Sequence, residues 1–430
     1  MDGEEWTDLV ACAQGGRWIR VSERTDYLVR TDGNRTYPWR VFILADSPAK
    51  LCEADIVFAL ARPPAADSDF SWVRPGKVAW DWWNGFDNQG RLKGCTTKTY
   101  ERFIDFAAKN GVEYVILDEG WSEKLDIWRF NPKVDVLYLI DYAAKRNVGI
   151  ILWMAWAQIV GDEARVAEHF GKLGAKGFKV DFMDRGDAEA ERFLWTFADE
   201  CAKRHLLVDY HGAHRPTGME RAHPNVLNFE GVHGLESMKW FKNEYDFMAS
   251  DLASYYTRMT AGPADYTPGA MDNYPPGKYK GSSVNAGSVG TRSRQMAMMT
   301  AFFAPLQMLC DSPTKYEKNM ECFRFMAETP VVWDETRGLG GDPDSFVLVA
   351  RRKGEVWYVA GLSNADARIV SVDLSFLGSG EWMAETFRDA GESAERPTSY
   401  VHETVSVLGG GRRDLRMAPG GGFVMRLTKR

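Results

Sequence analysis

The chain of 430 residues contains only six cysteines, and no two of them are spaced as Cys-x-x-Cys. This dispersal argues against a common zinc knuckle, and a cysteine inside an apolar run, such as Cys310, is typical of a buried free thiol. No run reaches the roughly 18 apolar residues of a membrane span, and the first residues lack the basic and apolar stretches of a secretory signal. As given, the sequence therefore predicts a cytoplasmic protein with no membrane partner.

Positive charge in excess is also missing. The formal net charge is -7, so the surface lacks the basic footprint of a nucleic-acid-binding protein. Tryptophan, by contrast, is abundant, with 16 residues. Most of them are expected in the core, but indole rings also form flat platforms that suit the apolar faces of a sugar.

Residue patterns divide the chain into three regions. Residues 1–75 show short β-rich runs at 18–21 and 40–44 and then a Pro-Pro linker, whereas residues 76–330 alternate short apolar runs with amphipathic stretches. Residues 331–430 return to β-rich runs, at 346–350, 356–360 and 423–427. The last region is expected to be a small all-β domain, here a β-sandwich.

The middle region predicts an α/β fold, a (β/α)8 TIM barrel. Its strand candidates lie at 78–82, 114–118, 149–153, 178–182, 206–210 and 226–230, with a seventh near 258–265 and an eighth near 306–311. Helical spacing of apolar residues appears between them, at 100–109, 134–146 and 189–204. A doubly wound open sheet is the alternative, but no Gly-x-Gly-x-x-Gly turn follows any strand.

Catalytic groups of a TIM barrel lie where its strands end, and here the predicted strands end in carboxylates and indoles. Trp83 follows the first strand, and Asp118, Glu119 and Trp121 follow the second. Carboxylates hold sugar hydroxyls and perform acid–base work, while indoles stack on sugar faces. This combination predicts glycoside cleavage, with these four residues as substrate contacts. For Asp118 and Glu119, solvated acids at the rim are the alternative.

Asp181 ends the fourth predicted strand, two residues after Lys179. Alternate residues of a strand share a face, so the Lys179 ammonium is expected beside the Asp181 carboxylate and would keep it ionised, as a nucleophile requires. By position alone, Asp181 also fits a helix cap or a loop. His211 ends the fifth strand, and we interpret it as polar lining of the substrate site.

Glu230 and Glu236 follow the sixth predicted strand and are six residues apart. Two carboxylates on one loop could share a hard cation such as Ca²⁺, although two solvated loop acids would have the same spacing.

Taken together in this order, several segments make the chain similar to glycoside hydrolase family 97. They are Pro38-Trp39-Arg40-Val41, Trp80-Asp81-Trp82-Trp83, Leu117-Asp118-Glu119-Gly120-Trp121, Gly177-Phe178-Lys179-Val180-Asp181-Phe182, Asn228-Phe229-Glu230 through Gly234-Leu235-Glu236, Thr257-Arg258-Met259, Ala261-Gly262-Pro263-Ala264-Asp265-Tyr266-Thr267-Pro268-Gly269 and Asp311-Ser312-Pro313. The resemblance covers about residues 36 to 430.

The resemblance implies a β-sandwich, a catalytic barrel and a C-terminal β-domain. It makes Asp181 a nucleophile, Glu236 the general acid/base, and Glu230 and Glu236 calcium ligands. Inverting α-glucosidases of the family carry a glutamate base after strand five, where this chain has His211-Gly212. The pattern therefore resembles the retaining α-galactosidases, whose substrates are α-galactosides or α-linked oligosaccharides.

The region before the barrel is much shorter than the family's N-terminal domain, so residues 1–75 are expected to form only a partial sandwich. That domain supplies further contacts, including a calcium ligand, so the Ca²⁺ site is expected to be incomplete. If the natural chain is longer, export to the periplasm or medium is expected instead of a cytoplasmic location. Two alternative functions remain: an inverting α-glucosidase of the same family, and a sugar-binding protein without turnover. The oligomeric state is left open.

Overall fold

The structure is a computed structural model that describes residues 32–34, 39–240 and 245–430, together with the backbone of four short strands before them. These strands pair as β1 (Glu5–Trp6) with β4 (Val29–Arg30), and β2 (Val10–Ala13) with β3 (Arg17–Arg20). The strand expected at 18–21 corresponds to β3, while Val21 lies outside the described residues. The strand expected at 40–44 is wrong. Those residues join no ladder, and the side chains of Phe42 and Leu44 are 83% and 94% exposed.

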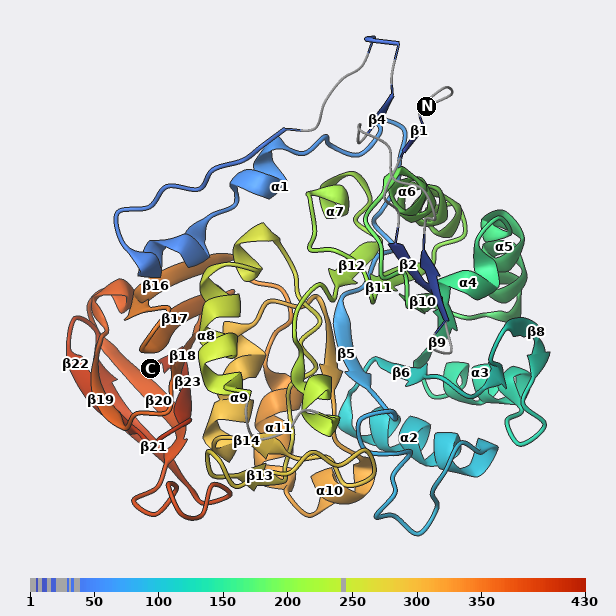
Figure 1. The fold of residues 1–430 in the computed structure, drawn as a ribbon. Coiled ribbons are helices and arrows are strands. Elements are labelled where there is room, and N and C mark those ends of the chain that lie inside the picture. The colour runs from blue at the N-terminus through green and yellow to red at the C-terminus, as the bar shows by residue number, and fades with distance from the viewer. Residues whose placement is uncertain are drawn as a thin grey trace.

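A sheet of seven parallel strands occupies the centre of the molecule, in the order β12-β11-β10-β9-β6-β5-β15 (Figure 1). The strands are β5 (Gly76–Ala79), β6 (Tyr114–Leu117), β9 (Gly149–Ala155), β10 (Gly177–Asp181), β11 (Leu207–Tyr210), β12 (Val226–Phe229) and β15 (Leu306–Leu309). Nearly every side chain in them is buried, because helices cover the outside and side chains fill the interior. The predicted TIM barrel is confirmed.

Helices surround these strands, and α2 (Thr97–Asn110) illustrates which residues begin a helix, end it and face the sheet. It begins after Thr96, whose side chain accepts a hydrogen bond from the Thr99 amide, and it ends at Gly111, in the left-handed region with φ 71°. Its buried residues Tyr100, Phe103, Ile104 and Ala107 recur at helical spacing and face the sheet. The helices are α1 (Ile56–Leu60), α2 (Thr97–Asn110), α3 (Val136–Ala144), α4 (Trp156–Ile159), α5 (Glu163–Leu173), α6 (Ala188–Ala202), α7 (Met219–Ala222), α8 (Phe247–Tyr256), α9 (Arg292–Ala301), α10 (Pro313–Glu317) and α11 (Met320–Glu328). The 3-10 helices are η1 (Pro48–Glu53), η2 (Leu235–Lys239), η3 (Met259–Ala261) and η4 (Ser375–Leu377), and two small ladders pair β7 (Ser122–Glu123) with β8 (Asp126–Phe130) and β13 (Asn273–Tyr274) with β14 (Ser288–Val289).

The seventh strand expected near 258–265 is wrong, because that stretch contains η3 and an irregular segment instead. The segment still closes the barrel: the amide of Asp265 donates to the carbonyl of Phe229 on β12 (3.1 Å), and the amide of Cys310 donates to that of Pro268 (3.2 Å). Arg258 completes this seam. Its guanidinium donates to five backbone carbonyls, those of Phe229, Glu230, Gly231, Gly262 and Pro263.

The last part of the chain forms an all-β unit beside α8 and α9 (Figure 1). Six antiparallel strands run in the order β16 (Glu335–Asp342), β17 (Phe346–Lys353), β18 (Val356–Ser363), β23 (Gly422–Lys429), β20 (Glu381–Asp389) and β21 (Tyr400–Leu408). A second ladder pairs β19 (Arg368–Asp373) with β22 (Arg412–Met417). Apolar side chains of both sheets share one core, which includes Val359, Val372 and Leu415. The predicted C-terminal β-fold is confirmed.

Within the part of the chain that the structure describes, we find no helix with both the length and the apolar character needed to cross a membrane.

Candidate active site

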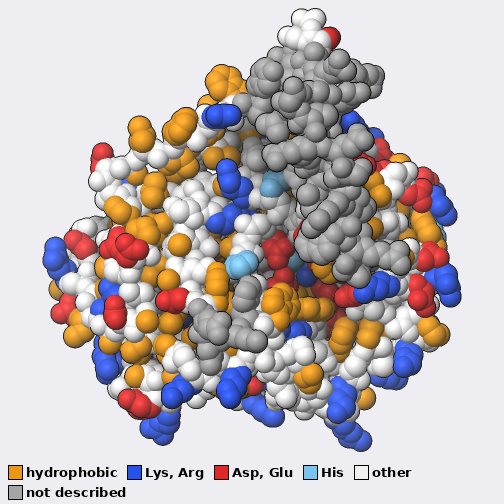
Figure 2. Space-filling view, in the orientation of Figure 1, with side chains coloured by type: hydrophobic (Ala, Val, Ile, Leu, Met, Phe, Trp, Pro, Cys, Tyr) orange, Lys and Arg blue, Asp and Glu red, His pale blue; other side chains and the backbone are white. Residues whose placement is uncertain are grey.

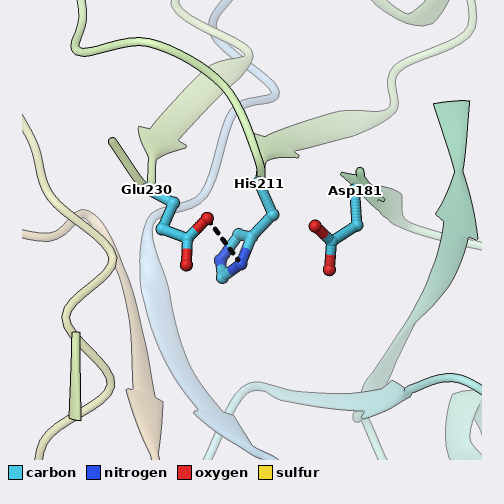
Figure 3. Close-up of side chains that lie close together, drawn as sticks. All are labelled: Asp181, His211 and Glu230. Carbon is cyan, nitrogen blue, oxygen red and sulfur yellow. Dashed lines mark ion pairs between the residues drawn. The ribbon is translucent and has the colours of Figure 1, made fainter. Parts of the chain in front are cut away.

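Three neighbouring strands bring Asp181, His211 and Glu230 together at one end of the barrel. Asp181 ends β10, His211 follows β11 and Glu230 follows β12. One ligand atom of each side chain lies within 4.8 Å of those of the other two. The side chains converge, with His211 between the two carboxylates (Figure 3). Acidic side chains gather in a hollow near the middle of the face seen in Figure 2, with histidine beside them.

Two N–H groups hold the carboxylate of Asp181. Its Oδ2 accepts a hydrogen bond from Trp153 Nε1 (3.1 Å), and its Oδ1 accepts one from the backbone amide of Phe182 (2.7 Å). Burial raises the pKa of Asp181, while His211, Lys179 and the Trp153 bond act in the opposite direction. The carboxylate is therefore oriented by fixed donors and lies in a desolvated place.

Glu230 and Glu236 are partly buried neighbours whose carboxyl groups interact electrostatically. Burial and the neighbouring Glu230 raise the pKa of Glu236 well above its usual value. Burial also acts to raise the pKa of Glu230, but His211, the bond from Glu236 and the amide of Gly212 (2.7 Å) together hold it below its usual value. The two pKa values are shifted in opposite directions, so Glu236 holds its proton more strongly than Glu230 does.

His211 is fully buried, and carboxylates surround it. Its Nε2 lies 2.7 Å from Oδ2 of Asp265 and 3.6 Å from Oδ2 of Asp209, and its Nδ1 lies 3.7 Å from Glu230. Burial and Lys179 act to lower the pKa of His211, but the three acids outweigh them and raise it well above its usual value. The surrounding acids therefore favour the protonated form of the His211 ring, which lies between Glu230 at the mouth of the barrel and Asp209 in its interior.

Lys179 makes its ion pair with Asp118, and not with Asp181 as we expected from strand alternation. The Lys179 ammonium lies 3.1 Å from Asp118 Oδ2, which also accepts a hydrogen bond from Trp80 Nε1 (2.7 Å). Both charged side chains are buried, at 2% relative exposure. Lys179 lies on the strand face that we predicted. Its nearest carboxylate, however, belongs to Asp118, which follows β6, two strands away from β10 in the sheet. Glu119 is half-buried. Burial raises the pKa of its carboxyl group, and the neighbouring Asp118 raises it further.

Lys239 is a site residue that the sequence did not reveal. It lies three residues after Glu236 on η2, so the two side chains share one side of this short helix. Its Nζ lies 3.6 Å from the ring centre of Trp82 and donates to the carbonyl of the same residue (2.8 Å). Burial lowers the pKa of Lys239 to about 8, while Glu236 and Asp118 oppose that effect. The i,i+3 spacing from Glu236 was the signal that could have found it.

Two of the predicted substrate contacts have no exposed face. Trp83 and Trp121 both have 0% relative exposure. Trp121 packs against Phe130 and Phe170, and its Nε1 donates to the carbonyl of Trp153 (2.7 Å). Their position after a strand was interpreted correctly, but both indoles are buried in the core, where they cannot stack on a sugar.

Two clusters of described side chains could hold a metal ion: Asp181 with His211 and Glu230, and Asp209 with His211 and Asp265. Calcium prefers oxygen ligands, so the imidazole in each cluster is a poor ligand for it. Glu230 and Glu236 fit better, because their carboxyl oxygens are the hard ligands that Ca²⁺ prefers. The two glutamates offer four oxygens, fewer than the six to eight that Ca²⁺ takes.

Comparison with known proteins agrees with this geometry. Residues 80–232 match the family Glycoside hydrolase 97, and residues 332–428 match the family described as Glycosyl-hydrolase 97 C-terminal, oligomerisation. The chain is 42% identical over 421 residues to a protein of Bacteroides thetaiotaomicron named retaining alpha-galactosidase, over 96% of this chain and 63% of the relative. The chain thus spans less than two thirds of that relative's length.

Solved structures agree on the fold. A glycoside hydrolase family 97 enzyme from Pseudoalteromonas sp. strain K8, in complex with acarbose, superposes with a TM-score of 0.79 at 23% identity, over 90% of this chain and 65% of the other. A beta-arabinopyranosidase superposes with a TM-score of 0.74, also at 23% identity, over 87% and 59%. The architecture is that of the barrel that these structures share. The chain belongs to glycoside hydrolase family 97.

Proposed function

We propose that the protein is a retaining glycoside hydrolase that removes terminal α-linked galactose. The observation that carries the proposal is the geometry of the carboxyls at the barrel mouth. Asp181 is oriented by two N–H donors, and the neighbouring Glu230 and burial raise the pKa of Glu236, which favours its acid form. A protonated acid together with a fixed carboxylate nucleophile is what a retaining mechanism requires. The name of the Bacteroides relative supports galactose as the sugar.

In this mechanism Asp181 attacks the anomeric carbon, and the bond to the leaving oxygen breaks as Glu236 gives that oxygen its proton. The product is a glycosyl ester on Asp181. Glu236 then takes a proton from water, which attacks the same carbon and releases Asp181 as a carboxylate. Each step inverts the anomeric configuration, so the sugar leaves with its original α configuration.

The remaining predicted contacts hold the sugar. We assign Asp118 and Glu119 to accept hydrogen bonds from its hydroxyls, and Lys179 and His211 to keep the surrounding carboxylates charged. We also propose that Glu230 and Glu236 hold Ca²⁺, which when bound supplies positive charge beside the leaving group.

Turnover on p-nitrophenyl α-galactoside and α-glucoside, with and without Ca²⁺, tests the activity, and NMR of the first-formed anomer tests retention. Asp181→Ala should lower kcat by about 1,000-fold or more, because the covalent step is lost. Azide should restore part of the rate and yield the β-galactosyl azide, since it enters from the face that Asp181 has left. Asp67→Ala, at an exposed position before the barrel, is the matched control. An Asp181→Ala protein of near-normal rate would refute the nucleophile.

An inverting α-glucosidase needs a carboxylate base after β11. In the described structure that position is His211, and the nearest acid on the strand, Asp209, is fully buried below it. A β-anomer as first product would establish inversion, and a protein that binds sugar without turnover would establish the non-catalytic alternative.

A further inference from the structure

A cavity of about 740 Å³ lies at the end of the barrel opposite the catalytic carboxyls. Its wall includes Val226, the first residue of β12, and Pro305, which precedes β15, so the cavity is at the N-terminal ends of the strands. The linker and the C-terminal sheet complete the wall where η1 packs on β16 (Figure 1). A cavity of this size between structural units is typical of a small-molecule site.

Arg351 brings a buried positive charge to this cavity. Its side chain, on β17, lines the cavity and is 7% exposed. Within the described residues its guanidinium makes one hydrogen bond, from Nη2 to the carbonyl of Ala301 (3.0 Å), and its Nε has no partner. The groups that act on its charge are the Tyr255 hydroxyl and the Cys52 thiol, and burial raises the pKa of both, so both stay neutral. A buried guanidinium without a counter-ion is costly, and this one therefore points to an anionic ligand.

The acids of the wall are engaged away from Arg351. Glu220 interacts with Arg258 instead, and Asp55 is exposed to solvent. The other three acids of the wall have cations of their own, in the pairs Glu53 with Lys50, Asp334 with Lys353 and Glu335 with Arg352. Together these five carboxylates repel a ligand with two negative charges, such as a phosphate monoester, more than a ligand with one. The wall therefore favours a single carboxylate.

Aromatic and aliphatic side chains form the surface next to Arg351. The ring centres of Phe303 and Trp333 lie 5.8 and 5.9 Å from the guanidinium carbon, and both rings line the cavity. Val57 and Met259 add aliphatic surface. A planar apolar body suits these walls, and a carboxylate matches the fork of N–H groups that a guanidinium presents.

We propose that this cavity binds a small aromatic monocarboxylate, with its carboxylate paired to Arg351 and its ring against Phe303 and Trp333. The site is separate from the catalytic carboxyls, because none of them lines the cavity. The ligand contacts the base of the barrel, the linker and the C-terminal sheet at once. Its binding therefore stabilises the junction of these three parts.

Isothermal titration calorimetry with 3-phenylpropionate, 3-phenylpropionamide and phenyl phosphate tests this site. We expect the carboxylate to bind at least about tenfold more tightly than the neutral amide, because only the carboxylate neutralises Arg351. At about pH 8 phenyl phosphate carries two charges and should bind more weakly than the carboxylate. Arg351→Met should lower the affinity for the carboxylate by about tenfold and bring it close to that for the amide. Arg324→Met, at an exposed position on α11 outside the cavity, is the matched control and should leave both affinities unchanged.

Cys52 reports on the same site without a substitution, because its thiol lines the cavity. Iodoacetamide labelling, followed by peptide mass spectrometry, should become slower at Cys52 when 3-phenylpropionate is present well above its Kd. Labelling of Cys95, which lies near Asp118 at the other end of the barrel, should not change. This measurement decides the matter if Arg351→Met fails to fold. Equal affinities for the carboxylate and the amide, tighter binding of phenyl phosphate, or an unprotected Cys52 would each overturn the proposed site.

Discussion

Lys77 places an ammonium group inside the barrel with no carboxylate bonded to it. The side chain is 3% exposed, and its Nζ hydrogen-bonds Oε1 of Gln307 on β15. Burial lowers the pKa of Lys77 to about 7, although Glu113 opposes the effect. The unfolded chain therefore binds a proton that the folded chain gives up, and stability should rise with pH between about 7 and 10.5.

The substitution Lys77→Met removes the free-energy cost of burying this amine. The difference between about 7 and 10.5 corresponds to at most about 5 kcal/mol, at about 1.4 kcal/mol for each pKa unit. The variant leaves Gln307 Oε1 without its donor, which costs about 1–3 kcal/mol. We therefore expect Lys77→Met to raise the free energy of unfolding by about 2 kcal/mol at pH 7. The gain should shrink as the pH rises toward 10, because removing the proton that the unfolded chain binds costs less as the pH approaches 10.5.

Urea unfolding of both proteins, followed by circular dichroism at about pH 6.5, 8 and 9.5, measures the difference directly. Groups other than Lys77 titrate equally in the two proteins and cancel. Lys176→Met, at an exposed lysine just before β10, is the control and should show a difference that does not vary with pH. If Lys77→Met is equally stable or less stable than the wild-type protein at all three pH values, the interior of the barrel solvates the ammonium and the reasoning fails.

Two more predictions concern the site. Because protons compete with Ca²⁺ for carboxylate ligands, the rise in Tm on adding Ca²⁺ should be larger at pH 7 than at pH 5, and Glu230→Gln should abolish it. A rise that is the same at both pH values places the ion elsewhere. Asp265→Asn removes the charge that faces the buried His211, so it should lower the free energy of unfolding by about 3 kcal/mol in a urea titration. Asp199→Asn is the control, because it changes an equally short but more exposed pair, with His223, and it should lower the free energy of unfolding much less. Equal losses of stability in the two variants would show that burial does not set the strength of the pair.

Much of the barrel could be predicted from the sequence. Strands that are buried on both faces appear as short apolar runs, and the helices between them show apolar residues at helical spacing. The seventh strand could not. The segment around Asp265 is held by single backbone hydrogen bonds and by the Arg258 guanidinium, and neither leaves a periodic pattern in the residues.

The residues of the site likewise divide into those that could be predicted from the sequence and those that could not. Asp181, His211 and Glu230 were predictable because parallel strands end at one edge, and each follows a recognisable run. Asp265 comes from an irregular segment, so nothing in its spacing placed it beside the acids, whereas Lys239 could have been found only from its spacing of three residues after Glu236. The direction of an indole after a strand is equally hidden, which is why Trp83 and Trp121 were taken as sugar platforms and are core residues instead.

The barrel is not closed by the same kind of contact all the way round, because Arg258 takes the place of a strand ladder at one point. Around most of the ring, neighbouring strands share a ladder in which the loss of one side chain leaves the backbone bonds intact. Between β12 and β15, one guanidinium gathers carbonyls from both sides of the gap, including that of Glu230. A residue that lies outside the catalytic carboxyls therefore helps to set the position of a proposed metal ligand. The contacts that close the ring on this side also hold the backbone of the acid pair, so the closure of the barrel and the geometry of the site are coupled.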